Sequence, residues 1–125
     1  MKTIHTDAAP AAIGPYSQAV RHGDLVFCSG QIPLDPNTME VVAGGIEEQT
    51  RQVFENLTAV AAAADSSLSR AIKLTIFLTD LGEFAKVNEI MAQYFSEPYP
   101  ARATIEVSAL PKGVQVEVEA VLSVG

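Results

Sequence analysis

Arg102 is the side chain in this sequence best suited to bind an anion, and it lies at the start of an alternating run. Pro100 precedes it, and Thr104 and Glu106 follow at steps of two, so the three polar side chains would share one face of a strand. A guanidinium can bind a carboxylate or a phosphate through two parallel hydrogen bonds. Because Arg102 is also the only arginine after Arg70, we expect it to be the group that binds an anionic ligand.

A second alternating run follows the turn at residues 110–113. If the two runs form a hairpin, Thr104 lies opposite Glu117 and Arg102 lies opposite Glu119, with all four side chains on one face. One interpretation of such a patch is a cross-strand ion pair, which contributes roughly 0.2–1 kcal/mol. The other is a small-anion pocket, in which Arg102 binds a carboxylate and a glutamate handles a water molecule or a proton.

Four other positions carry groups that could belong to a site, and each also has a structural explanation. Tyr16 follows a Gly-Pro turn and can be a packed aromatic with an exposed hydroxyl. Asn88 can be a satisfied core amide, and Ser29-Gly30 can be a strand end. Cys28, inside an apolar run, is expected to be an inert buried thiol.

Length and composition predict a single domain over residues 1–125 that can bury one core. A single cysteine excludes an intramolecular disulfide and favours a reducing compartment. The N-terminus has no apolar run of signal-peptide length, and nothing approaches the ~18 uninterrupted apolar residues of a membrane span. These features predict a soluble cytoplasmic protein.

The charge balance disfavours nucleic acid as the main partner. The formal net charge is −7, and the basic residues form no cluster of the kind that neutralises phosphates. His5, His22 and Cys28 show no metal-ligand spacing, so neither a metal nor another cofactor is expected. Any chemistry would then depend on carboxylates, hydroxyls, backbone groups and Arg102.

The elements that must position these residues follow from hydrophobic periodicity. Residues 46–64 predict an amphipathic helix, and residues 72–79 alternate as a long strand. Asp80 and Glu83 resemble a capping box before a second helix that ends near Phe95. With two strands before the first helix and two at the end, the order indicates an α+β fold with two helices on one face of a sheet.

The other face of this sheet is also expected to be covered. Phe77 and Val121 point to it, and residues 25–28 form a compact apolar run typical of a strand buried on both faces. An exposed apolar sheet face of this size indicates an interface. We therefore expect an oligomer whose subunits pack through this face.

Five ordered motifs resemble the RidA (YjgF-type) family over residues 3 to 122. They are Gly14-Pro15-Tyr16, the run from Ser29 to Pro33, Thr79-Asp80-Leu81 with Phe84 and Val87-Asn88, Pro100-Ala101-Arg102, and Leu110-Pro111-Lys112 with the run from Val116 to Ala120. The resemblance implies a chorismate-mutase-like mixed sheet and a homotrimer whose sheets line a central barrel, with a pocket at each subunit interface. It also implies an enamine/imine deaminase that hydrolyses 2-aminoacrylate, 2-iminopropanoate and 2-iminobutanoate to 2-oxo acids and ammonium, and so clears reactive intermediates of pyridoxal-phosphate enzymes.

The resemblance also implies roles for single residues. Arg102 would bind the substrate carboxylate, and Glu117 would activate or position the attacking water. Tyr16, Asn88 and Ser29-Gly30 would line the pocket. Thr104 stands where many members have a cysteine, which removes cysteine-based redox chemistry there but leaves its backbone able to face the ligand.

Two other functions stay open beside the deaminase. A non-catalytic sensor could use the same pocket to bind a 2-oxo acid, although the presence of Glu117 favours the enzyme. Some members of the family that this chain resembles are described as ribonucleases or translation inhibitors, which the acidic charge disfavours.

Overall fold

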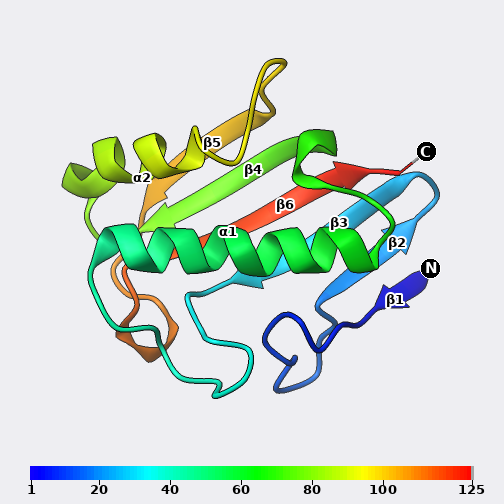
Figure 1. Cartoon of the computed structure of the whole chain (residues 1–125), viewed down its shortest axis with the longest axis horizontal. Coiled ribbons are helices and arrows are strands. Elements are labelled where there is room, and N and C mark those ends of the chain that lie inside the picture. The colour runs from blue at the N-terminus through cyan, green and yellow to red at the C-terminus, as the bar shows by residue number, and fades with distance from the viewer. Residues whose placement is uncertain (125) are drawn as a thin grey trace.

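A computed structural model describes residues 1–124, in which six strands form one sheet with the order β1-β2-β3-β6-β4-β5 (Figure 1). Every neighbouring pair is antiparallel except β4 and β5, which run parallel. The strands are β1 (Lys2–Ile4), β2 (Ala19–His22), β3 (Leu25–Gln31), β4 (Ala71–Leu78), β5 (Ala101–Glu106) and β6 (Val116–Ser123).

Helix α1 (Ile46–Ala63) confirms the predicted helix and runs across the sheet (Figure 1). Its start is fixed by the backbone N–H of Gly45, which donates to the Glu48 carboxylate at 3.0 Å. Glu47 and Glu48 lie in the first turn, where the helix dipole favours negative charge. The helix ends before Asp65, whose φ of 59° cannot continue it.

Helix α2 (Phe84–Met91) is shorter than predicted, and the expected capping box is wrong. The Asp80 carboxylate accepts a hydrogen bond from the N–H of Gly82 at 2.8 Å, inside a short 3₁₀ turn over Leu81–Glu83 that leads into the helix. The chain after Met91 forms turns up to Phe95 and then the segment with Pro98 and Pro100.

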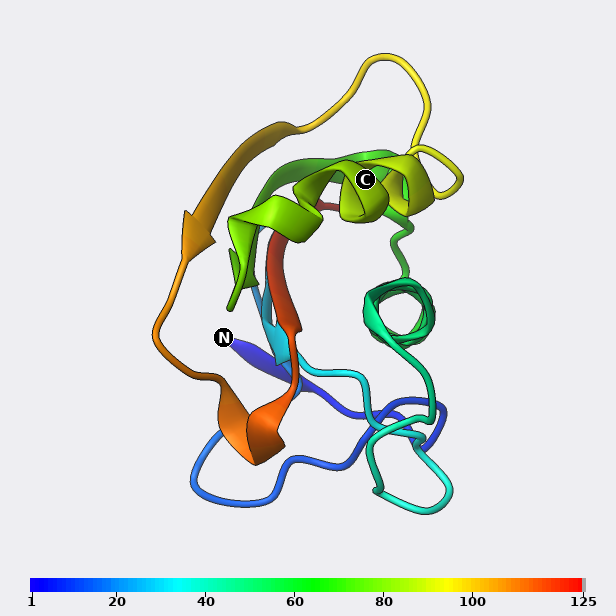
Figure 2. The same ribbon diagram turned by 90° about the vertical axis from the view of Figure 1, so that its left-hand side faces the viewer.

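Both helices cover one face of the sheet, which confirms the predicted α+β arrangement. Seen along the sheet edge, α1 lies on one side of the sheet (Figure 2). The side chains beneath the helices are buried and alternate along the two central strands. They are Leu74, Ile76 and Leu78 on β4, and Val116, Val118, Ala120 and Leu122 on β6.

The predicted hairpin between the last two strands is wrong. β6 lies between β3 and β4, so β4 separates it from β5 at the sheet edge. The residues between them include a 3₁₀ turn at Pro111–Gly113, in which Lys112 takes a φ of 57°. The cause is burial, because β6 offers an unbroken apolar face that fits the centre of the sheet, whereas β5 carries Arg102, Thr104 and Glu106 on the corresponding face.

The face without helices is open in the single chain and carries apolar side chains beside the charged Glu117, Glu119 and Lys73. Phe27 and Ile105 are each 44% exposed there, and Phe77 and Val121 lie among them. In the single chain β3 is therefore buried on one face only, not on both as the sequence suggested. Cys28 faces the helices and is buried, as predicted.

Candidate active site

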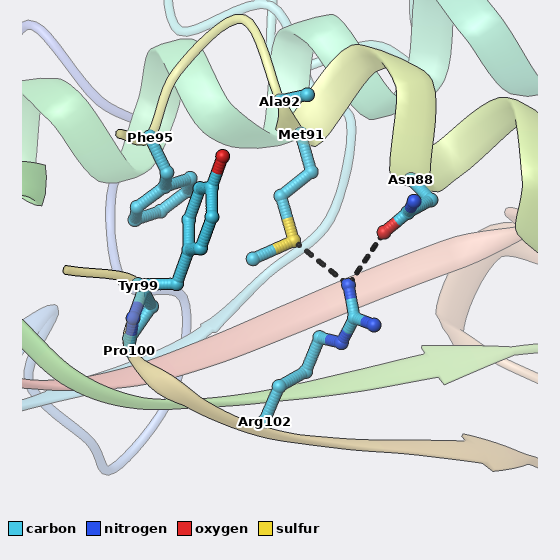
Figure 3. A pocket seen from close by; sticks show the side chains of 7 residues that line it. All are labelled: Asn88, Met91, Ala92, Phe95, Tyr99, Pro100 and Arg102. Atoms are coloured by element: carbon cyan, nitrogen blue, oxygen red, sulfur yellow. Dashed lines mark hydrogen bonds between the residues drawn. The ribbon is translucent and has the colours of Figure 1, made fainter. Parts of the chain in front are cut away.

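Arg102 projects from edge strand β5 toward α2, where Asn88 and Met91 lie against its guanidinium (Figure 3). Its Nη1 donates to Asn88 Oδ1 at 2.6 Å and lies 3.6 Å from the sulfur of Met91. The guanidinium carbon lies 4.9 Å from the centre of the Phe84 ring, a cation–π contact. Nε and Nη2 of Arg102 make no hydrogen bond within residues 1–124, so the side of the guanidinium that carries these two nitrogens is available to bind a carboxylate.

The sequence named Arg102 and Asn88 but missed the contribution of Phe84 and Met91 to the same group. The signal was present, because these α2 residues recur at the helical spacing of four and three and therefore lie on one side of the helix. A cavity of about 460 Å³ adjoins the guanidinium. Its walls are Asn88, Met91, Ala92, Phe95, Tyr99, Pro100 and Arg102.

A second cluster gathers at the end of β3, where Glu117 meets Gly30. The register between β3 and β6 shifts between Cys28 and Gln31, which makes Ser29-Gly30 an irregular segment beside β6. The Glu117 side chain packs directly over Gly30. The Ser29 hydroxyl donates to the carbonyl of Ser17 at 2.5 Å and ties this strand end to the chain next to Tyr16.

Tyr16 stands at the rim of this second cluster. Its N–H donates to the Gly14 carbonyl at 2.9 Å, and Gly14 adopts a φ of 127° that favours glycine. The ring is 54% exposed and lines a groove of about 410 Å³ together with Gly30, Ile32 and Pro111. The sequence-predicted residues Tyr16, Ser29, Gly30 and Glu117 are thus brought together by the fold.

Burial raises the pKa of the Glu117 carboxyl above its usual range, and the negative charge of Glu119 raises it further. The carboxyl is half-buried. A glutamate with a raised pKa is a stronger base once ionised, which suits proton transfer near neutral pH.

The two clusters lie on opposite faces of the sheet, which corrects the expected patch of four residues. Arg102 and Thr104 pair with Leu74 and Ile76 of β4 and therefore face the helices. Glu117 and Glu119 pair with Phe77 and Thr75 and face the open side. The ion pair between Arg102 and Glu119 is therefore wrong as well, since a sheet separates the two side chains.

Other reactive groups lie outside these clusters. Burial raises the pKa of the Cys28 thiol to about 12, so the thiolate is scarce at neutral pH. Among residues 1–124, no three His, Cys, Asp or Glu side chains are grouped in a way that would hold a metal ion. Within the same residues, neither helix has the length and apolar character that crossing a membrane requires.

Comparison with known proteins gives strong matches over the whole chain. The family model described as "Endoribonuclease L-PSP" matches residues 6–124. The protein DfrA of Myxococcus xanthus is 57% identical, with 96% of this chain and 93% of that protein covered. The human protein named 2-iminobutanoate/2-iminopropanoate deaminase is 44% identical, with 96% of this chain and 88% of that protein covered.

A solved structure shares the fold. The crystal structure of RidA from the Antarctic bacterium Psychrobacter sp. PAMC 21119 superposes with a TM-score of 0.96 and 51% sequence identity, covering 99% of this chain and 100% of that one. The family match, the identities and the shared fold agree. The chain therefore belongs to the Endoribonuclease L-PSP family, to which the RidA proteins belong.

Proposed function

We propose that this protein is an enamine/imine deaminase that hydrolyses 2-aminoacrylate, 2-iminopropanoate and 2-iminobutanoate to 2-oxo acids and ammonium. The observation that carries the proposal is the guanidinium of Arg102, fixed by Asn88 and Met91 with one edge free for a carboxylate. The human relative, by its name, acts on two of these imino acids, which supports an imine hydrolase.

The reaction needs a group that binds the carboxylate of the substrate, a water molecule and a base. Arg102 would bind the carboxylate and so orient the neighbouring imine carbon. Water would attack that carbon while Glu117 accepts its proton, a form of base catalysis typically worth ~10²–10⁴-fold. Glu117 then passes this proton to the nitrogen of the protonated imine, which becomes an –NH3+ leaving group. The C–N bond breaks as the C–OH group becomes the C=O of the 2-oxo acid, and the hydroxyl proton passes to the departing ammonia, so that ammonium leaves without any change of oxidation state. 2-Aminoacrylate first takes a proton from solvent on its CH2 carbon and so becomes the same protonated imine.

The separation of the two clusters supports an assembly in which sites form between subunits. Within one chain, Arg102 and Glu117 face opposite sides of the sheet. A second copy packed against the open face could bring its Glu117, Tyr16 and Gly30 to the first copy's Arg102. We therefore propose a cytoplasmic homotrimer whose sheets line a central barrel, with one site at each of the three interfaces.

Arg102→Ala is expected to abolish imine clearance while the fold stays intact, because Arg102 lies on an edge strand and is exposed. The assay follows 2-oxo acid formation when an amino acid dehydratase supplies the imine, with circular dichroism to verify the fold. A rate near that of the unchanged protein would contradict the assignment of Arg102.

Glu117→Gln separates an enzyme from a 2-oxo acid sensor. The glutamine fills the same space but cannot accept a proton, so turnover should fall by ~10²-fold or more while 2-oxo acid binding persists. Calorimetric titration with 2-oxobutanoate measures binding. A variant that keeps full turnover would contradict the role of Glu117 as the base.

A ribonuclease is the second candidate, because the description of the matching family names an endoribonuclease. The net charge of −7 disfavours it, since affinity for RNA comes largely from neutralised phosphates. RNA binding measured against salt concentration decides between them. Tight binding with a steep salt dependence would favour the ribonuclease.

A further inference from the structure

Gly30 lies directly beneath the carboxylate that we assign as the base. A Cβ atom added to Gly30 would lie 2.9 Å from the carboxyl carbon of Glu117 and 3.1 Å from its Cγ, with Oε2 closer still. Real Cβ atoms essentially never approach another heavy atom within 3.0 Å. A side chain at position 30 and the Glu117 carboxylate in its present place therefore exclude each other.

The backbone gives no separate reason for a glycine at this position. Left-handed φ values occur at Gly14, Gly23, Gly44 and Gly113, but Gly30 is not among them. Gly30 therefore lacks the left-handed φ that would strain an alanine. The obstacle to a side chain is the Glu117 carboxylate itself.

The irregular pairing of β3 explains how the two residues meet. Val118 pairs with Gln31, and the register shift just before Gln31 leaves Gly30 beside Glu117. We propose that Gly30 is a positioning residue, whose missing side chain leaves the space in which the Glu117 carboxylate is held for proton transfer. This inference rests on the proposed function, because it assumes that Glu117 handles the proton of the attacking water.

The charged side chains on the elements around Glu117 are Glu119 on the same strand, Lys73 on β4 and Lys112 in the turn before β6. Gly30→Ala changes none of these charges. A shift in the pH dependence of the variant would therefore report a displaced Glu117 carboxylate.

Gly30→Ala tests the proposal through kcat, KM and the pH profile together. We expect kcat to fall by about tenfold or more, within the ~10²–10⁴-fold that a general base supplies. KM is measured beside kcat, because Gly30 also lines the groove of the proposed site and an added methyl group there can weaken substrate binding by itself. The acid limb of the pH profile, where activity falls as Glu117 is protonated, should move to lower pH. The reason is that the displaced carboxyl loses part of the burial that raises its pKa.

Gly45→Ala is the matched control. An added Cβ there meets no heavy atom within 4 Å, so the kinetics should not change. If Gly30→Ala also keeps the kcat and acid limb of the unchanged protein, the proposal is overturned.

A double variant tests whether Gly30 acts through Glu117. In a Glu117→Ala background the clash is gone, so adding Gly30→Ala should cause no further loss of activity. An equal loss in both backgrounds overturns the proposal. If Gly30→Ala alone does not fold, the double variant should fold like Glu117→Ala, and an unfolded double variant also overturns it.

Carbon-13 NMR of labelled glutamate separates this inference from the proposed function. If the protein hydrolyses no 2-imino acid, the deaminase proposal fails, yet the titration of Glu117 can still be followed. A lower Glu117 pKa in Gly30→Ala than in the unchanged protein supports the positioning role. An equal pKa in both proteins overturns it.

Discussion

At the scale of single residues, the candidate site combines a fixed cation with a carboxylate that is costly to ionise. Asn88 and Met91 bind one nitrogen of Arg102 and Phe84 lies against its plane, so the side chain loses little further freedom when a ligand binds. Burial and the charge of Glu119 both make Glu117 hold its proton to a higher pH. If Glu117 is the base, as proposed, it acts only above a pKa higher than that of an ordinary glutamate.

Glu119→Gln should shift the acid limb of kcat/KM to lower pH. Removing the neighbouring negative charge removes one cause of the raised Glu117 pKa, while burial, the larger cause, remains. Because the base must be deprotonated to act, a lower pKa extends activity to more acidic solution. Rates measured from pH 4 to pH 8 on preformed imine give the midpoint.

Glu47→Gln serves as the control for this prediction. It removes the same charge from the exposed first turn of α1, so the acid limb should stay in place. A Glu119→Gln profile that coincides with both the control and the unchanged protein would show that Glu119 does not influence the base.

At the scale of elements, strong hydrophobic periodicity was enough to predict α1 and β4. The pairing of β5 was predicted wrongly, because β5 was expected to pair with β6, the next strand in the sequence. Helix α1 and strand β4 bury one regular stripe each, which any tertiary arrangement would preserve. The pairing of β5 depends on which strand is most apolar across the whole sheet, and a β5–β6 hairpin was the simpler local choice. Strand β1, with three residues, was too short to show a pattern.

The candidate site, like the fold, could be predicted from the sequence only in part. Residue types singled out Arg102, Asn88 and Glu117, but the faces they occupy follow from strand order. An error in strand order therefore placed Arg102 beside Glu117 when β4 stands between their strands. The spacing of Phe84 and Met91 places both on one side of α2, whereas their contact with Arg102 depends on how α2 sits over β5.

The packing of α1 against the chain after α2 depends on Phe54, which is fully buried and contacts two aromatic rings. Its ring centre lies 5.3 Å from that of Tyr94 and 5.7 Å from that of Phe95. Phe54→Ala should lower the free energy of unfolding by about 3–5 kcal/mol, because it removes buried surface and leaves a cavity. Urea unfolding at a fixed protein concentration measures the change.

Tyr99→Ala is the matched truncation of an exposed aromatic residue, with 61% of Tyr99 exposed. It should change the unfolding free energy by no more than about 0.5 kcal/mol. Equal losses for the two variants would show that α1 does not depend on Phe54 for its packing.

At the scale of the whole molecule, the separation of the two clusters by the sheet makes assembly part of the proposed chemistry. The Arg102 cluster faces the helices, and the Glu117 cluster lies on the open face. A single chain therefore presents the Arg102 cluster on one face of its sheet and the Glu117 cluster on the other. Complementation between two inactive variants can test this arrangement.

Arg102→Ala and Glu117→Gln chains, unfolded together in equal amounts and refolded, should recover activity. If each site takes Arg102 from one subunit and Glu117 from the next, about one quarter of the sites in random trimers contain both side chains. The measured rate should then be about a quarter of that of the unchanged protein. Each variant refolded alone should stay inactive, and an inactive mixture would place the whole site within one chain.

The hydrogen bond from Ser29 to Ser17 has a consequence for which ligands this strand end can recognise. The hydroxyl has one proton, and that proton is already given to the Ser17 carbonyl, so Ser29 offers only a lone pair to anything else that approaches it. A molecule that binds to this oxygen must bring its own hydrogen. A protonated imine carries such an N–H group, whereas the carbonyl oxygen of a 2-oxo acid does not, so in the proposed deaminase a ligand in contact with Ser29 would be held better as the imine than as the 2-oxo acid.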